Sequence, residues 1–269
     1  MSATEKEILQ RDRPRRSWRE VVRALPIGFL AALQFLTVLP PLVRRPLTAE
    51  ELGRAVGWFA VVGILLGGTL SGADYALGLL FPPGVAAALL LAAWVLATGA
   101  LHLDGFLDAC DGLFGGHTPE ARLRIMRDER VGAFAVIGGV LLLLVKYSCL
   151  AGLARRGNAL IVAPTLARGA MAVAIVAFPY ARPDGLGRWM KDHAGWWQAA
   201  LAGSAALGTA ALMAGWLGLV ALTLAVVATA AVAVFVLRRL PGLTGDIYGA
   251  LCEIVEVLVL LTFVAGEKA

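Results

Sequence analysis

The chain carries seven long stretches in which almost every residue is apolar. Each has roughly the 20 residues that an α-helix needs to cross about 30 Å of hydrocarbon. Polar and apolar residues do not alternate within them, as the strands of a transmembrane barrel would require. The pattern therefore predicts seven transmembrane helices, at about 55–81, 85–103, 131–153, 158–179, 198–214, 216–237 and 248–265.

An eighth apolar segment, LPIGFLAALQFLTVLPPLV at 25–43, is shorter and has prolines near both ends. An arginine-rich tail precedes it, and Arg44, Arg45 and Arg54 follow it. Because basic residues concentrate in cytoplasmic loops, both flanks are expected on the cytoplasmic side. The segment is therefore predicted to be a re-entrant or interfacial helix, since irregular backbone is tolerated at membrane depth where protein or water covers it.

Four glycines in the first predicted span form overlapping pairs of small residues. This pattern lets the backbones of two membrane helices approach closely. We expect a role in helix packing for these residues, which are Gly63, Gly67, Gly68 and Gly72.

Composition supports an all-α, polytopic transmembrane helix bundle, because 59% of the residues are hydrophobic and only 16% are charged. A soluble domain has about 45–50% apolar residues, so the excess is expected to face lipid. We expect a single integral membrane catalytic domain over 25–269, preceded by a basic cytoplasmic tail over 1–24. The tail is expected to touch anionic lipid rather than nucleic acid. Its arginines are Arg11, Arg13, Arg15, Arg16, Arg19 and Arg23.

Basic residues also predict the orientation of the loops. They concentrate in the loops 104–130, 180–197 and 238–247, which are therefore predicted to be cytoplasmic. The pair Arg155-Arg156 falls on the opposite side, against the rule.

Three aspartates follow the second predicted span, in the sequence HLDGFLDACDG at 102–112. Asp104, Asp108 and Asp111 stand at i, i+4 and i+7, which places them on one stripe of a helix. Like charges at this spacing repel, and the membrane edge adds a desolvation penalty. A divalent cation such as Mg²⁺ would offset both effects, because carboxylates are suitable ligands for it. The alternative is a solvated helix end whose aspartates simply face the cytoplasm.

Two neighbours of the aspartates bear on the same site. The role of His102 is left open between a ligand, a proton donor and an ordinary interfacial histidine. Gly105 and Gly112 leave the backbone uncovered beside the acids, so we expect a bulky substrate to approach there.

A short basic helix is predicted next, in the loop sequence GGHTPEARLRIMRDERVG. Thr118 suits the N-cap and Pro119 the first helical position. Arginine forks match phosphate geometry, so this helix beside a carboxylate–metal cluster suits a diphosphate substrate. The competing interpretation is positive-inside charge alone, and Asp128 and Glu129 either join the site or pair with the arginines. The arginines are Arg122, Arg124, Arg127 and Arg130.

Charged residues also occur inside the predicted spans, where they are costly and usually functional. Lys146 lies within VLLLLVKYS and Arg168 within APTLARGAM. In GLTGDIYGALCEIVEVLVLL, Asp246, Glu253 and Glu256 need a cation or a basic partner. We expect these acids to meet the aspartates in one polar pocket, open to the cytoplasm and lined from at least three helices.

Several motifs are similar, in their order along the chain, to those of a known family. They are FLTVLP at 35–40, HLDGFLDACDG, RDERVGAF, PYARPDGLG at 179–187 and GLTGDIYGA, with the Lys146 span among them. Each motif alone has low specificity, but the ordered set covers nearly the whole chain after the tail. On these motifs the sequence resembles the cobalamin synthase family, the adenosylcobinamide-GDP ribazoletransferases.

The resemblance implies a Mg²⁺-dependent transferase of the last steps of vitamin B12 biosynthesis. In this family a hydroxyl of α-ribazole, or of its 5′-phosphate, attacks the corrinoid-side phosphorus of adenosylcobinamide-GDP, and GMP leaves. The expected location is the cytoplasmic (inner) membrane of a prokaryote, with the active site facing the cytoplasm. The oligomeric state, a homo-oligomer included, stays open.

The candidate site residues follow from both arguments. By resemblance, Asp104, Asp108 and Asp111 match the family's acidic motif and Asp246 its GLTGD motif, so we expect all four to be catalytic. Ligand chemistry assigns Mg²⁺ to the first three. The candidates for substrate binding are His102, Arg122, Arg127, Asp128, Lys146, Arg168, Glu253 and Glu256.

Two other functions compete with this interpretation. A CDP-alcohol phosphotransferase-like lipid synthase also uses aspartates and a divalent metal in a membrane helix. That family has an Ala-Arg pair three residues after its first Asp-Gly, where this chain has Asp108 and Ala109, so the pattern fails. A cation transporter would place acids near mid-membrane in several spans, whereas these acids gather at one face.

Overall fold

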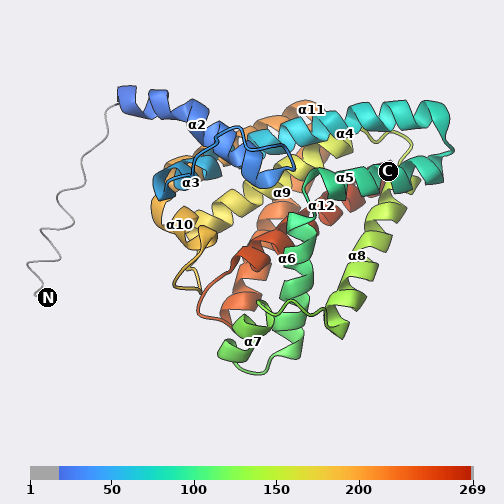
Figure 1. Ribbon diagram of the computed structural model, residues 1–269. Helices are drawn as coiled ribbons and strands as arrows, with labels where there is room; N and C mark the ends of the chain where they lie inside the picture. The colour runs from blue at the N-terminus through green and yellow to red at the C-terminus, as the bar shows by residue number, and fades with distance from the viewer. Residues whose placement is uncertain (1–17, 268–269) are drawn as a thin grey trace, which may run out of the picture.

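The structure is a computed structural model that describes residues 18–267. Within that range the chain is almost entirely helical, and the only β-pairing is an isolated bridge between Tyr180 and Leu243. The predicted all-α helix bundle is therefore confirmed (Figure 1). Most of the predicted basic tail falls on 1–17, outside the described residues, and the first described helix begins at Trp18.

The helices follow one another without strands between them. Two short elements, η1 and η2, are a 3₁₀-helix and a π-helix. The described elements are α2 (Trp18–Leu36), α3 (Ala49–Ala55), η1 (Val56–Trp58), α4 (Phe59–Leu80), α5 (Pro83–Ala97), α6 (Leu101–Cys110), η2 (Asp111–Gly115), α7 (Pro119–Ile125), α8 (Ala133–Gly152), α9 (Gly157–Ala177), α10 (Leu186–His193), α11 (Trp196–Leu237) and α12 (Gly245–Gly266).

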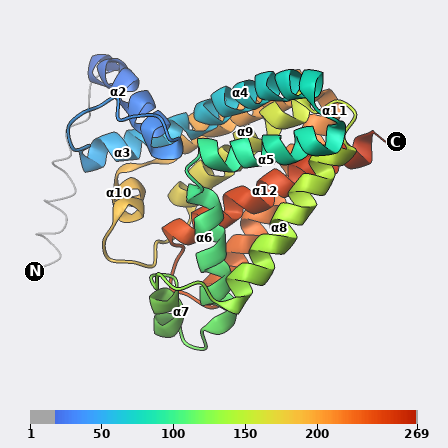
Figure 2. The same ribbon diagram turned by 45° about the vertical axis from the view of Figure 1, so that its right-hand side comes forward.

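The bundle has two distinct ends. The helices α2, α3 and α10 gather at one end, and the turn between α4 and α5 lies at the other, near the C-terminus (Figure 1 and Figure 2). Five helices in the described chain are long and apolar enough to cross a membrane, or six if α5 and α6 count as one bent span. Each of the seven predicted apolar runs is helical over most of its length.

Helix α11 contains two of the predicted runs and breaks between them. Gly215 has a φ of +53°, a conformation that glycine adopts without steric cost. In a straight helix, residues eight apart are separated by about 12 Å. A Cβ atom on Gly218 would instead overlap the carbonyl oxygen of Ala210, so the chain folds back on itself at Gly215.

The second predicted span, 85–103, is wrong at its C-terminal end. Helix α5 stops at Ala97, and Gly99 and Ala100 have positive φ values of +59° and +57°. Helix α6 then leaves at 89° to α5. The aspartates therefore lie on a separate helix after a sharp turn, which the uninterrupted apolar composition of this stretch does not reveal.

The segment 25–43 also differs from a regular span. Its helix ends at Leu36, and the described apolar part, Pro26–Leu36, is shorter than a membrane crossing requires. The chain then turns back, with the Val43 amide donating to Gln34 Oε1 at 3.2 Å. This geometry agrees with the predicted re-entrant or interfacial helix.

The contacts of Arg156 explain its position on the side where the positive-inside rule does not expect a basic residue. Its guanidinium donates to Asp74 Oδ1 at 2.7 Å, to the Pro83 carbonyl at 3.1 Å and to the Leu150 carbonyl at 2.5 Å. One buried arginine thereby ties the ends of α4, α5 and α8 together, which accounts for a basic residue on this side.

Two of the four glycines in α4 pack as predicted. A Cβ atom on Gly63 would lie 2.5 Å from the Pro164 carbonyl oxygen, and one on Gly67 would lie 2.5 Å from the backbone of α9. Gly68 and Gly72 face open space, so their packing role is not confirmed.

Replacing Gly63 by alanine is expected to destabilise the bundle, because the added methyl group overlaps the backbone of α9. Overpacking of this kind costs about 1–3 kcal/mol. The check is the thermal midpoint in detergent, with Gly68→Ala as the matched control that should unfold like the wild type. Equal midpoints for the two variants would contradict the contact between α4 and α9.

Candidate active site

Helices α6 and α12 cross at a contact between two glycines. A Cβ atom on Gly105 would lie 3.1 Å from the Asp246 Cα atom, and one on Gly249 would lie 3.0 Å from the His102 carbonyl oxygen. Helix α12 covers the side of Gly105 on which a Cβ atom would lie, but the residue also lines the adjoining cavity, so the expectation that a substrate approaches there stays a prediction. The close crossing places Asp104 beside Asp246.

Gly112, the other glycine expected to leave space for a substrate, is also covered by protein. A Cβ atom there would overlap the side chain of Met126 and lie 3.0 Å from the Arg122 carbonyl oxygen. The second uncovered stretch of backbone is therefore used to pack α7 against η2.

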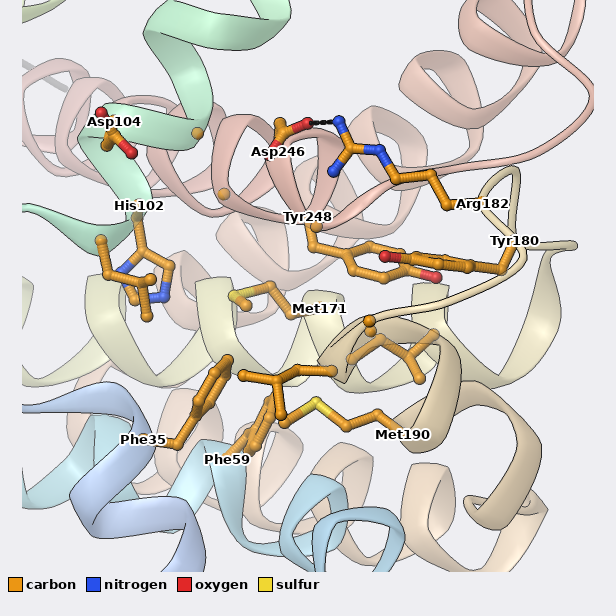
Figure 3. Close-up of a pocket in the computed structure, with 18 of the residues that line it drawn as sticks. Phe35, Phe59, His102, Asp104, Met171, Tyr180, Arg182, Met190, Asp246 and Tyr248 are labelled. Carbon is orange, nitrogen blue, oxygen red and sulfur yellow. Dashed lines mark hydrogen bonds and ion pairs between the residues drawn. The ribbon is translucent and has the colours of Figure 1, made fainter. Parts of the chain in front are cut away.

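A cavity of about 300 Å³ opens beside this crossing. Its lining residues come from α2, α4, α6, α9, α10 and α12, from the loop before α10 and from the loop after α7. The charged groups lie along one wall, and the apolar side chains lie along the opposite wall (Figure 3). The labelled lining residues are Phe35, Phe59, His102, Asp104, Met171, Tyr180, Arg182, Met190, Asp246 and Tyr248.

The loop before α10 brings an arginine into this wall. Two backbone hydrogen bonds of 2.8 Å, Ala181 to Leu243 and Leu243 to Pro179, hold the loop against the start of α12. Arg182 can then donate to Asp246 Oδ2 at 2.6 Å (Figure 3). In the sequence Arg182 was only one of several loop charges, and the PYARPDGLG motif was the signal that could have singled it out.

Two tyrosines, Tyr180 and Tyr248, also line the cavity. The rings of Tyr180 and Tyr248 stack, with centroids 6.1 Å apart and planes at 24°. Burial raises the pKa of the Tyr180 hydroxyl above its ordinary value. The motifs PYARPDGLG and GLTGDIYGA contain these tyrosines, but their stacking could not be predicted because it depends on the position of the loop.

A second cavity of about 290 Å³ adjoins the first, and Asp104 and Arg127 line both. Asp108 lies in this second cavity, within electrostatic range of Asp104 and Asp246. Among the side chains that the structure describes, those of residues 26–267, neither Asp104 nor Asp108 has a hydrogen bond or an ion pair, whereas Arg127 pairs with Asp184 at 3.1 Å. Two carboxylates thus face the cavities without a protein partner.

Asp111 is placed differently from the other two aspartates. Its carboxylate accepts hydrogen bonds from the Gly132 amide at 2.6 Å and the Ala135 amide at 2.9 Å, which caps the start of α8. It also begins the π-helical turn η2.

Among the described residues, no group of three acidic, histidine or cysteine side chains is arranged to hold a metal ion. The assignment of magnesium to the three aspartates stays a prediction, and this arrangement offers Asp104 and Asp108 for it.

The short basic helix begins as predicted. Thr118 caps α7 by accepting from the Ala121 amide, and Pro119 is its first residue. Of its arginines, Arg122 lies 3.5 Å from the Arg239 carbonyl and outside both cavity linings. Asp128 lines the second cavity and pairs with Arg130 at 2.8 Å, which lowers its pKa to about 2. Arg130 and Arg127 therefore reach the cavity edge from the loop after α7.

The charged residues inside the spans bind one another instead of lining the cavities. Lys146 Nζ donates to Glu253 Oε2 at 2.6 Å and to Glu256 Oε2 at 2.5 Å. Arg168 Nη1 donates to Glu256 Oε1 at 2.8 Å, and its Nη2 lies 3.4 Å from His102 Nδ1. All four ionised side chains are buried, and their charges cancel. The expectation that the glutamates point at the aspartate pocket is corrected, because basic partners on α8 and α9 already satisfy them.

The fold and the cavities define an integral membrane protein whose site combines unpaired carboxylates with guanidinium groups, a combination suited to phosphorylated ligands. A family model described as cobalamin-5-phosphate synthase matches residues 28–264. The chain belongs to this family.

Three individual relatives are similar to this chain over most of its length. An adenosylcobinamide-GDP ribazoletransferase of Pseudomonas aeruginosa (strain UCBPP-PA14) is 44% identical over 251 residues, which cover 90% of this chain and 98% of that protein. Proteins of the same name from Geotalea daltonii and Roseiflexus sp. are 39% and 38% identical over 238 residues. Those matches cover 88% of this chain and 96% and 88% of the relatives, respectively. No solved structure matches the chain.

Asp111→Ala is expected to lower the free energy of unfolding by about 1–2 kcal/mol, since it removes a helix cap. Asp108→Ala is the matched control, and it should unfold at the same temperature as the wild type or slightly higher, because it relieves repulsion from Asp104. Thermal unfolding in detergent makes the comparison. A midpoint for Asp111→Ala at or above that of Asp108→Ala would show that Asp111 does not act as a cap.

Lys146→Met is expected to destabilise the protein strongly, because it leaves the carboxylates of Glu253 and Glu256 short of one buried positive charge. Breaking a buried ion pair by removing one partner costs about 3–5 kcal/mol. The double variant Lys146→Met with Glu253→Gln restores neutrality and should recover much of the lost thermal midpoint. No recovery in the double variant would contradict charge balance as the organising factor.

Proposed function

We propose that the protein is an adenosylcobinamide-GDP ribazoletransferase, which joins α-ribazole or its 5′-phosphate to adenosylcobinamide-GDP and releases GMP. The observation that carries the proposal is the pair of unpartnered carboxylates, Asp104 and Asp108, beside Arg127 and Arg182 in adjoining cavities. The family membership and the names of the relatives support it.

The reaction is an exchange at one phosphorus atom. The ribazole hydroxyl oxygen forms a bond to the phosphorus nearest the corrinoid, and the bond from that phosphorus to the oxygen of GMP breaks. The hydroxyl proton leaves to a carboxylate or to water in the cavity. Such transfers depend mainly on positioning the reactants and on stabilising negative charge.

Arg127 and Arg182 are the groups suited to bind the diphosphate. Arg182 donates to Asp246 through one nitrogen, and its buried Nε has no partner within residues 18–267. A guanidinium has five donors, so a phosphate can bind Arg182 while Asp246 keeps it in place. Arg127 lines both cavities and can reach a ligand that spans them.

Asp104 and Asp108 would hold Mg²⁺, because magnesium in proteins commonly takes one or two carboxylates together with substrate phosphates. When bound there, Mg²⁺ would supply positive charge that stabilises the negative charge developing on the diphosphate. Asp111 would act on the site by anchoring α8 behind it.

The site is proposed to face the cytoplasm, in the cytoplasmic (inner) membrane. The cavity walls include residues of the arginine-rich loops 104–130 and 180–197. Loops of this composition are retained on the cytoplasmic side. The nucleotide substrate would then enter without crossing the bilayer.

Purified protein given adenosylcobinamide-GDP, α-ribazole and Mg²⁺ is expected to release GMP. Asp104→Asn and Asp108→Asn should each lower the rate by about 100-fold or more, because each removes charge stabilisation at the reacting phosphate. Asp192→Asn, an exposed aspartate paired with Arg188, is the matched control and should leave the rate unchanged. A chelator should abolish turnover and added Mg²⁺ should restore it.

Full turnover in chelator-treated enzyme would overturn the magnesium proposal. Turnover of CDP-diacylglycerol in place of adenosylcobinamide-GDP would favour the lipid-synthase alternative.

A further inference from the structure

His102 is a buried residue with one unused polar atom. The side chain lines the 300 Å³ cavity, and the residue is only 2% exposed. Its Nδ1 lies 3.4 Å from Arg168 Nη2, whereas its Nε2 is buried and has no hydrogen-bond partner within residues 18–267. Buried polar atoms in folded proteins nearly always have a partner, so an unpartnered Nε2 beside a cavity points to a ligand that supplies one.

The contact with Arg168 determines which ring nitrogen carries the proton. A guanidinium can only donate hydrogen bonds, so Nδ1 must accept and must be unprotonated. A neutral imidazole then carries its hydrogen on Nε2. Arg168 is itself fixed by Glu256 Oε1 at 2.8 Å, and Glu256 by Lys146. The buried ion network therefore presents His102 as a neutral hydrogen-bond donor.

The side chains around His102 indicate which kind of ligand would accept a hydrogen bond from it. The ring lies between the charged wall and an apolar wall (Figure 3). The volume, about 300 Å³, equals about ten water molecules at about 30 Å³ each, which suits a bicyclic aromatic base. The apolar and aromatic lining residues are Phe35, Phe59, Leu101, Met171, Ile175, Tyr180, Leu186, Met190 and Tyr248.

The substrates of the proposed reaction carry two heteroaromatic bases, guanine and dimethylbenzimidazole, which differ in polarity. Guanine carries several donors and acceptors on its edges, and the apolar wall would leave those that face it unpaired, while the charged wall opposite is assigned to the diphosphate. The dimethylbenzimidazole base of ribazole has an apolar methylated ring and a single unsubstituted ring nitrogen, N3, which accepts one hydrogen bond. His102 Nε2–H, set among aromatic and methionine side chains, matches N3 of the benzimidazole, and the Tyr248 hydroxyl, buried and without a partner among the described side chains, lies in the same cavity lining.

We propose that this cavity is the ribazole-base site and that His102 Nε2–H donates a hydrogen bond to N3 of the benzimidazole. The inference rests on the proposed function, and it assigns this cavity to one of the two substrates, ribazole. With the base against the apolar wall, the ribose lies toward Asp104 and Asp246, where the cavity meets the carboxylate-lined neighbour. The attacking hydroxyl is thereby placed beside the diphosphate.

The test compares α-ribazole with its indole analogue, in which N3 is replaced by C–H, as substrates for GMP release. The wild type is expected to prefer α-ribazole by about three- to tenfold in kcat/KM, the value of one neutral hydrogen bond. His102→Leu should lose this preference, with a ratio near one. His102→Gln, whose amide can still donate, should retain part of it.

The matched control is His117→Leu, since His117 is an exposed histidine in the loop before α7. It should keep the wild-type ratio. If the wild type used both substrates equally, or if His102→Leu lowered both by the same factor, His102 would have only a structural role and the base site would lie elsewhere.

The wild-type ratio needs no substitution, so it tests the proposal even if His102→Leu fails to fold. Failure of the wild type to release GMP from α-ribazole would overturn the proposed function itself and this inference with it. Normal GMP release without discrimination between the two substrates would overturn the inference alone.

Discussion

The structure depends on one constraint, the balance of ionised groups inside a lipid-embedded bundle. Lys146, Arg168, Glu253 and Glu256 are buried together, and their two positive and two negative charges cancel. Because each ion would be prohibitively costly alone in hydrocarbon, the four lock α8, α9 and α12 to one another. That fixed core lets α6 cross α12 at two glycines and orients His102 toward the adjoining cavity.

The acids that line the cavities, in contrast, are not balanced by basic partners. Asp104 and Asp108 repel each other and have no hydrogen bond or ion pair in the described part of the chain. A site that retains such repulsion loses stability, and the loss is usually offset by a bound ligand. In the proposed function magnesium and a diphosphate supply that ligand, and Arg127 and Arg182 complete the charge balance.

Much of the fold could be predicted from the sequence, because the apolar runs are long and membrane helices satisfy their own backbone hydrogen bonds. The cap at Thr118 followed from a local signal, and the proximity of Asp246 to Asp104 followed from the expectation that both acidic groups lie at the cytoplasmic end. The turn after Ala97 could not be predicted, since its residues, Thr98, Gly99 and Ala100, are small residues that also occur within membrane helices. The role of Arg182 was hidden because its position depends on a contact between distant segments.

The most direct measurement is an electron-microscopy structure of the protein with adenosylcobinamide-GDP and Mg²⁺. The account predicts an ion between the carboxylates of Asp104 and Asp108, the diphosphate against Arg127 and Arg182, and Asp111 still capping α8. An ion held by Asp111 with that cap broken, or a diphosphate bound away from both cavities, would contradict it.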